Sequence, residues 1–177
     1  MDVALTFDRS DGMTTVDQFA GTWTYRSFIN TPQFNATADE VLLVTGDLIL
    51  EVGGEVEGVV RTSAGLDLDC GNKISGKQSF HNGVSVSLTV SGTAKSGKPP
   101  TIRFRTTGVE GTPTAGWIYD FIGYLAPFWP KGEGQRPTIV GTVIRTVQHM
   151  SLVGGEVRPA GVTLSFIAVS RDRPAAS

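Results

Sequence analysis

The chain has 177 residues, of which 40% are hydrophobic and 18% charged, and its formal net charge at pH 7 is −2. This length suits a single domain, residues 1–177, and a small net charge without a basic stripe argues against nucleic acid as a partner. One cysteine, Cys70, excludes an internal disulfide framework. The sequence shows neither a signal peptide, with its basic residues followed by an apolar run, nor an apolar stretch of about 20 residues, so it predicts a cytoplasmic protein with no membrane partner.

The first predicted element is one helical turn over residues 15–19, after a loose lead-in over residues 1–14. Thr14 or Thr15 is its predicted cap. The residues that follow alternate as a strand, in which one face carries Trp23, Tyr25 and Ser27.

Alternating apolar and polar residues then predict a succession of strands separated by turn signals. Gly53-Gly54 is predicted as a tight turn, and Asn82-Gly83 is the strongest hairpin signal in the chain. Residues 171–177 are predicted to form a loose tail. The later strands are predicted at 47–52, 55–62, 66–70, 74–81, 84–91, 101–107, 117–125, 138–150 and 162–170.

Hairpin succession without a long helix predicts an all-β fold, an antiparallel up-and-down β-barrel of eight to nine strands. Such a barrel removes exposed edges by closing on itself. A two-sheet sandwich is the alternative.

The start of the first full strand, Gly21-Thr22-Trp23, directly after the helical turn, resembles the Gly-x-Trp signature of lipocalin and avidin-like (calycin-type) barrels. The resemblance implies an eight-stranded barrel around a ligand cavity. It also implies that an arginine near the end of the last strand, Arg171 or Arg173, packs over Trp23. Barrels of this general shape also occur in allene oxide cyclase-like enzymes, in which the cavity is a reaction chamber.

Aromatic residues concentrate between residues 116 and 130, which hold two of the three tryptophans and two of the three tyrosines. Strand alternation separates two faces, and the pattern leaves open which of them points inward. Ligand-binding roles are predicted for the aromatic residues Tyr25, Trp117, Tyr119, Phe121 and Trp129. Trp129 lies in a proline-rich loop, residues 126–137, that could act as a lid.

The candidate catalytic residues are Asp120, Tyr124, Arg145 and His149. If Asp120 and Tyr124 point inward, they could meet Arg145 or His149 from the next strand, and Asp120 could act as a general base. The alternatives are a structural ion pair between Asp120 and Arg145, core packing of the tyrosine, and an exposed histidine at a strand end.

Several kinds of site are excluded by spacing. Two distant histidines and one cysteine have no zinc-ligand spacing, so no metal is predicted. No phosphate-binding loop opens a helix, no nucleophile elbow is present, and no cofactor is predicted.

Two functions from different classes follow. The first is a β-barrel that encloses a small, largely apolar organic ligand. The second is a cofactor-independent isomerase or cyclase that uses the same cavity. A structural barrel whose exposed aromatic residues form a homo-oligomer interface is a third reading.

Overall fold

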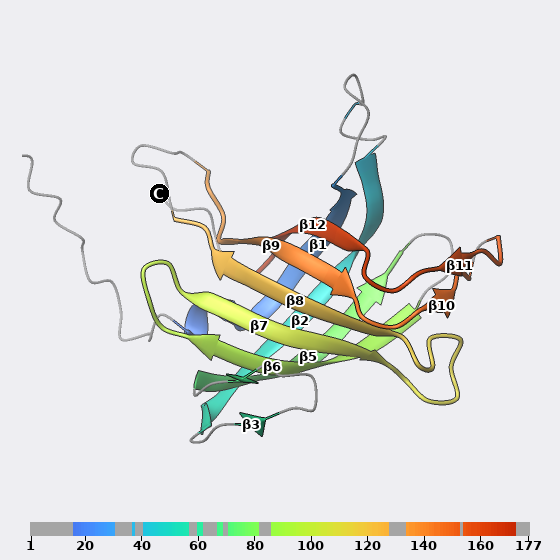
Figure 1. The fold of residues 1–177 in the computed structure, drawn as a ribbon. Coiled ribbons are helices and arrows are strands. Elements are labelled where there is room, and N and C mark those ends of the chain that lie inside the picture. The colour runs from blue at the N-terminus through green and yellow to red at the C-terminus, as the bar shows by residue number, and fades with distance from the viewer. Residues whose placement is uncertain are drawn as a thin grey trace, which may run out of the picture.

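The computed structural model describes residues 16–30, 37, 41–56, 60–61, 67–68, 71–81, 86–127, 134–152 and 154–172. Its main feature is one closed antiparallel barrel in the order β1-β12-β9-β8-β7-β6-β5-β2 (Figure 1). The barrel strands are β1 (Gly21–Ile29), β2 (Leu42–Val56), β5 (Gly71–Phe80), β6 (Val86–Lys95), β7 (Thr101–Gly108), β8 (Ile118–Leu125), β9 (Thr138–Arg145) and β12 (Thr163–Ser170). The predicted up-and-down barrel is confirmed, with eight strands in it.

Two pairs of short strands lie outside the barrel order. β3 (Val60–Arg61) pairs with β4 (Asp67–Leu68) between β2 and β5, and β10 (His149–Met150) pairs with β11 (Val157–Arg158) between β9 and β12. The short helix η1 (Asp17–Phe19) precedes β1. No helix in the described part of the chain is long and apolar enough to cross a membrane.

The predicted turn at Gly53-Gly54 is wrong. β2 continues through both glycines and pairs with β5 on either side of a register shift between Val52 and Glu55. Two glycines inside a strand therefore mark a bulge here, where the extra residues bend the strand without reversing it. The second hairpin signal, Asn82-Gly83, lies outside the described residues.

The strand predicted over residues 138–150 is also too long. The last ladder bonds of this segment run from the Arg145 amide to the Val162 carbonyl and from the Thr146 amide to the Ile118 carbonyl. Beyond them the chain leaves the barrel wall, and His149 pairs instead with Arg158. The β10–β11 arm formed in this way is closed by a bond from the Ser151 amide to the Glu156 carbonyl, and its turn contains Gly154 and Gly155, both with positive φ.

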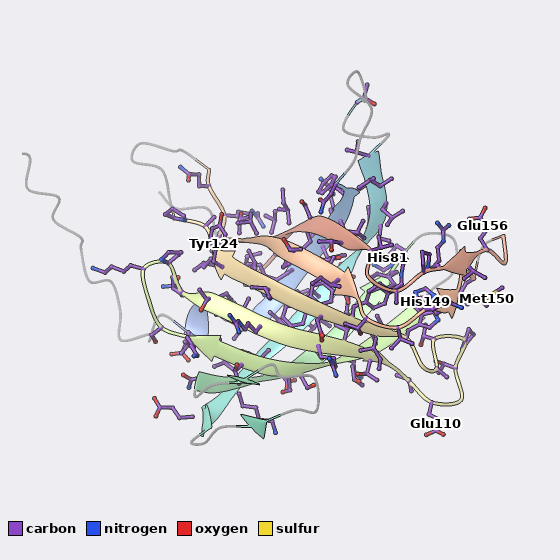
Figure 2. All side chains as sticks on the ribbon, viewed as in Figure 1. His81, Glu110, Tyr124, His149, Met150 and Glu156 are labelled. Atoms are coloured by element: carbon purple, nitrogen blue, oxygen red, sulfur yellow. The ribbon has the colours of Figure 1, made fainter. Side chains whose placement is uncertain are left out.

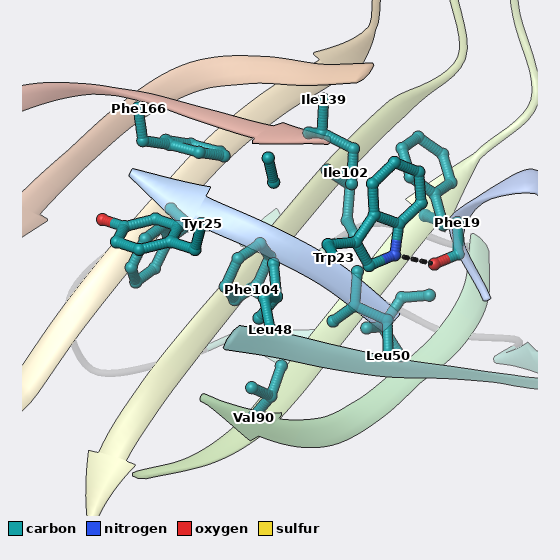
Figure 3. Close-up of a cluster of buried hydrophobic side chains, with 14 of the residues drawn as sticks. Phe19, Trp23, Tyr25, Leu48, Leu50, Val90, Ile102, Phe104, Ile139 and Phe166 are labelled. Atoms are coloured by element: carbon teal, nitrogen blue, oxygen red, sulfur yellow. Dashed lines mark hydrogen bonds between the residues drawn. The ribbon is translucent and has the colours of Figure 1, made fainter. Parts of the chain in front are cut away.

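One end of the barrel, next to η1, is filled by side chains. Trp23 and Phe19 are fully buried there, and the Trp23 indole Nε1 donates a hydrogen bond to the Phe19 carbonyl oxygen at 3.0 Å (Figure 3). The residue preceding the helix is Val16, so the helix has no side-chain cap, and the predicted caps Thr14 and Thr15 lie outside the described part. We call this end the closed end.

The strand that ends the barrel is fastened next to Trp23. The Arg171 amide donates to the Thr22 carbonyl at 2.8 Å, and the Thr22 amide donates to Asp172 Oδ2 at 2.5 Å. The Arg171 guanidinium bonds Asp47 Oδ1 on β2 at 2.6 Å. The start of the predicted tail is therefore tied to β1 and β2, whereas Arg173 lies beyond the described residues.

Candidate functional site

A cavity of about 360 Å³ opens at the other end of the barrel, where the β10–β11 arm lies. We call this the open end. Its volume falls at the lower limit of the roughly 300–1,000 Å³ typical of small-molecule pockets. Most of the lining is apolar or aromatic, and it comes from strands on all sides of the barrel. The lining residues are Tyr25, Ser27, Leu43, Val44, Phe80, Val86, Trp117, Tyr119, Phe121, Val143, Arg145, His149, Ser151, Leu152, Arg158 and Leu164.

Aromatic rings form the inner wall of this cavity. Tyr25 from β1 stacks on Phe166 from β12, with ring centroids 5.8 Å apart, and meets Phe121 from β8 edge-on at 6.1 Å. Phe121 in turn stacks on Phe104 at 4.4 Å. These rings come from four strands, so barrel packing holds the two that line the cavity, Tyr25 and Phe121, in place.

The polar part of the cavity gathers near the mouth. Tyr119 on β8 and Arg145 on β9 are direct register partners, and both side chains line the cavity. Only 8% of Arg145 is exposed. The Tyr119 hydroxyl lies 2.5 Å from Nε2 of His149, which the β10–β11 arm brings over the same wall. Figure 2 shows His149 beside Met150 at this end of the barrel.

The hydrogen bonds of His149 define its tautomer. Its Nδ1 lies 2.9 Å from the Met150 carbonyl oxygen, which can only accept, so Nδ1 carries the proton in the neutral ring. Nε2 is then an acceptor and takes the Tyr119 hydroxyl proton in a hydrogen bond. The ring also stacks on Trp117 with centroids 3.9 Å apart. The tyrosine proton is therefore already committed to the histidine.

Burial shifts the pKa values of His149 and Tyr119 in the directions that favour the neutral form of each side chain. It lowers the pKa of His149, and the positive charges of Arg145 and Arg158 add to that effect. It raises the pKa of Tyr119, against an opposing hydrogen bond from Arg145. Near neutral pH the pair is thus an uncharged hydroxyl and an uncharged imidazole beside guanidinium groups.

We expect the free energy of unfolding to fall as pH drops below about 6.5, the ordinary histidine pKa. The unfolded chain protonates His149 there before the folded protein does, so the unfolded state binds more protons and gains stability relative to the fold. Urea unfolding between about pH 5 and 8 measures this slope. The slope should be smaller in His149→Asn, and an unchanged slope in that variant would contradict the argument.

Buried polar groups lie next to the Tyr25 hydroxyl. Burial raises the pKa of Tyr25 above its usual range, although Ser27 and Gln78 next to its hydroxyl act in the opposite direction. The side chain of Gln78 is fully buried, and neither its amide nitrogen nor its amide oxygen has a hydrogen-bond partner within the described structure. Of these residues Tyr25 and Ser27 line the cavity, so its lining offers hydroxyl groups as well as rings.

Six of the predicted site residues lie together around the cavity. They share an inward face of their strands or reach the mouth from the β10–β11 arm. These residues are Tyr25, Trp117, Tyr119, Phe121, Arg145 and His149. Trp129 and half of its predicted lid, residues 128–133, lie outside the described residues.

Asp120 and Tyr124 are not part of this group. Of the two faces that the sequence left open, theirs is the outer one, so they do not meet Arg145 or His149 in the cavity. Both occupy the outer face of β8, and Figure 2 shows Tyr124 at the end of the barrel away from His149. Asp120 faces Arg105 across the β7–β8 ladder, where Arg105 Nε and Nη2 donate to its two oxygens at 2.7 and 2.8 Å. Its ion pair is structural, with Arg105 in place of the predicted Arg145.

Three lining residues, Arg158, Ser151 and Leu152, were not predicted from the sequence; they line the cavity from the β10–β11 arm and its neighbourhood. No periodic pattern marked this short arm as an element. For Ser27 a signal was present, because a small polar residue follows Trp23 and Tyr25 on the inward face of β1.

Comparisons of the chain with protein-family models, with curated proteins and with solved structures found no match. The closed antiparallel barrel agrees with the architecture that the lipocalin and avidin-like resemblance implies.

Proposed function

We propose that this protein binds a small, largely apolar organic molecule inside its barrel. The observation that carries the proposal is the open cavity itself, whose wall is built from aromatic side chains of several strands. Side chains fill the closed end and the cavity lies at the open end, so a ligand would enter the barrel through the open end. The lipocalin-like start of β1, Gly21-Thr22-Trp23, is in keeping with this proposal.

The isomerase or cyclase alternative receives less support. Asp120, its candidate general base, lies on the outer face of β8 and is paired with Arg105. A binding role needs no such base, because an apolar wall with a few polar groups is enough to hold and orient a ligand.

The neutral fluorophore N-phenyl-1-naphthylamine tests the proposal. We expect saturable fluorescence enhancement with one site per chain, since the cavity is apolar and open at one end. Val44→Trp adds an indole to the cavity lining and should remove most of the binding. Ile122→Trp adds the same group to an exposed outer position and should keep it.

Failure of the wild-type protein to bind this probe would contradict the proposal. Equal binding by the Val44→Trp and Ile122→Trp variants would place the probe outside the barrel and contradict it as well. Circular dichroism of both variants verifies that each retains the β-sheet signal of the wild type.

A further inference from the structure

Arg145 is a buried cation without an acidic partner among the residues that the structure describes. It is only 8% exposed. Its Nη1 donates to the Pro159 carbonyl oxygen at 2.9 Å, and its guanidinium also hydrogen-bonds the Tyr119 hydroxyl. Its Nε has no partner within the described structure, and no described carboxylate pairs with it. A buried charge without a counter-charge is costly, and guanidinium groups form their strongest contacts with carboxylates. Arg145 therefore presents unused binding capacity to the cavity that it lines.

A second guanidinium lies at the same mouth. Arg158 belongs to β11 and lines the cavity together with Arg145. It pairs with Glu156 at 3.2 Å, but the Glu156 side chain is 70% exposed, so this bridge is a weak surface interaction that a ligand can replace. Among the described lining residues there is no aspartate or glutamate, which leaves the mouth of the cavity electropositive.

The tyrosine and histidine at the mouth leave anion recognition to the arginines. The Tyr119 proton is donated to His149 Nε2, and the Nδ1 proton of His149 is directed at the Met150 carbonyl. Neither group offers a free proton to a ligand oxygen in this arrangement. The charged donors that the lining offers an anion are the guanidinium N–H groups of Arg145 and Arg158, which match the two oxygens of a carboxylate.

We propose that the ligand is a small aromatic carboxylate, with its acid group at Arg145 and Arg158 and its ring against the aromatic wall at Tyr25 and Phe121. This assignment rests on the proposed function and narrows the ligand from an apolar molecule to an organic anion. The pair Tyr119–Arg145 and the pair Phe121–Val143 are neighbouring inward-facing pairs of β8 and β9. The carboxylate and the ring of the ligand would therefore contact neighbouring positions of the same two strands. The cavity volume of about 360 Å³ limits the ring system to a small one.

A matched pair of ligands tests the proposal. 2-Naphthoate carries the acid, whereas 2-naphthamide has the same ring and nearly the same shape without the charge. Each displaces bound N-phenyl-1-naphthylamine in a titration near neutral pH. We expect the wild-type protein to prefer naphthoate by roughly 10- to 100-fold, the range of a charge-assisted hydrogen bond.

Three arginine variants show which residue causes the preference for the acid. Arg145→Gln should bind the neutral fluorophore but lose most of the preference for the acid. Arg103→Gln removes the same charge from an exposed position on the outer face of β7 and should keep the preference. Arg158→Gln should reduce it in part. If Arg145→Gln does not fold, Arg145→Lys and Arg158→Gln still report on the site, together with the wild-type comparison.

The outcomes separate this inference from the proposed function. No binding of the neutral fluorophore by the wild type contradicts the proposed function. Binding of the fluorophore with equal affinity for naphthoate and naphthamide overturns the aromatic-acid assignment alone. A preference that persists in Arg145→Gln and disappears in Arg103→Gln also overturns it, because the anion would then bind outside the cavity.

Discussion

Replacing Trp23 with alanine is expected to lower the free energy of unfolding by about 3–5 kcal/mol, the usual range for a buried tryptophan. Trp23 is fully buried at the closed end, packed in the core with Phe19 and Leu50. Its removal leaves a large hole that the surrounding strands cannot fill, because each is held by two neighbours in a closed barrel. Urea unfolding monitored by circular dichroism measures the change.

Two further variants separate packing from hydrogen bonding at this position. Trp23→Phe keeps much of the ring but removes the Nε1 donor to the Phe19 carbonyl, so we expect an intermediate loss of stability. Tyr124→Ala removes an aromatic ring from an exposed position on the outer face of β8 and should have a much smaller effect. A loss in Trp23→Ala no larger than in Tyr124→Ala would contradict the role of the closed end.

Gly76→Ala is expected to lower the free energy of unfolding by roughly 2–5 kcal/mol, from backbone strain and overpacking together. Gly76 lies in β5 with φ of +150°, a conformation that residues with a side chain rarely adopt. A Cβ at this position would overlap the Ile49 carbonyl oxygen on β2. Both effects act at once, and the rigid ladder on either side of Gly76 gives neither strand room to move.

Gly54→Ala is the matched control for this prediction. Gly54 also lies in a barrel strand, but a Cβ there would meet open space. We expect its free energy of unfolding to stay within about 0.5 kcal/mol of the wild type, as for most surface substitutions. Thermal and urea unfolding of both variants measure the difference, and similar losses in the two would argue against strain at Gly76.

The barrel itself was predictable, because period-two alternation and hairpin spacing are local properties of the sequence. The face of β8 that points inward was not, since both of its faces carry apolar residues. A signal for the register is nevertheless present. When Phe104 is set opposite Phe121, Arg105 falls opposite Asp120, and the structure contains both pairs. Rings paired inside and opposite charges paired outside would have placed Asp120 on the outer face.

The mouth of the cavity could be predicted only in part. Arg145 follows the inward alternation of β9, so its place in the cavity is a continuation of the strand pattern. Arg158 reaches the cavity because β9 ends and the chain forms the β10–β11 arm, which depends on where pairing partners run out. The point at which β9 ends is set by the assembled sheet. The sequence does not show it, because the apolar and polar alternation continues through Val147 and His149.

The order of pairing around the barrel has a consequence for synthesis of the chain. Each barrel strand pairs with the next one along the sequence, except that β1 also needs β12, the last strand to be made. Until β12 leaves the ribosome, β1 and β9 both present unpaired backbone edges, which are templates for aggregation. A chain that stops before residue 163 would thus carry two open edges in place of a smaller barrel, and closure is an all-or-none event set by the final strand.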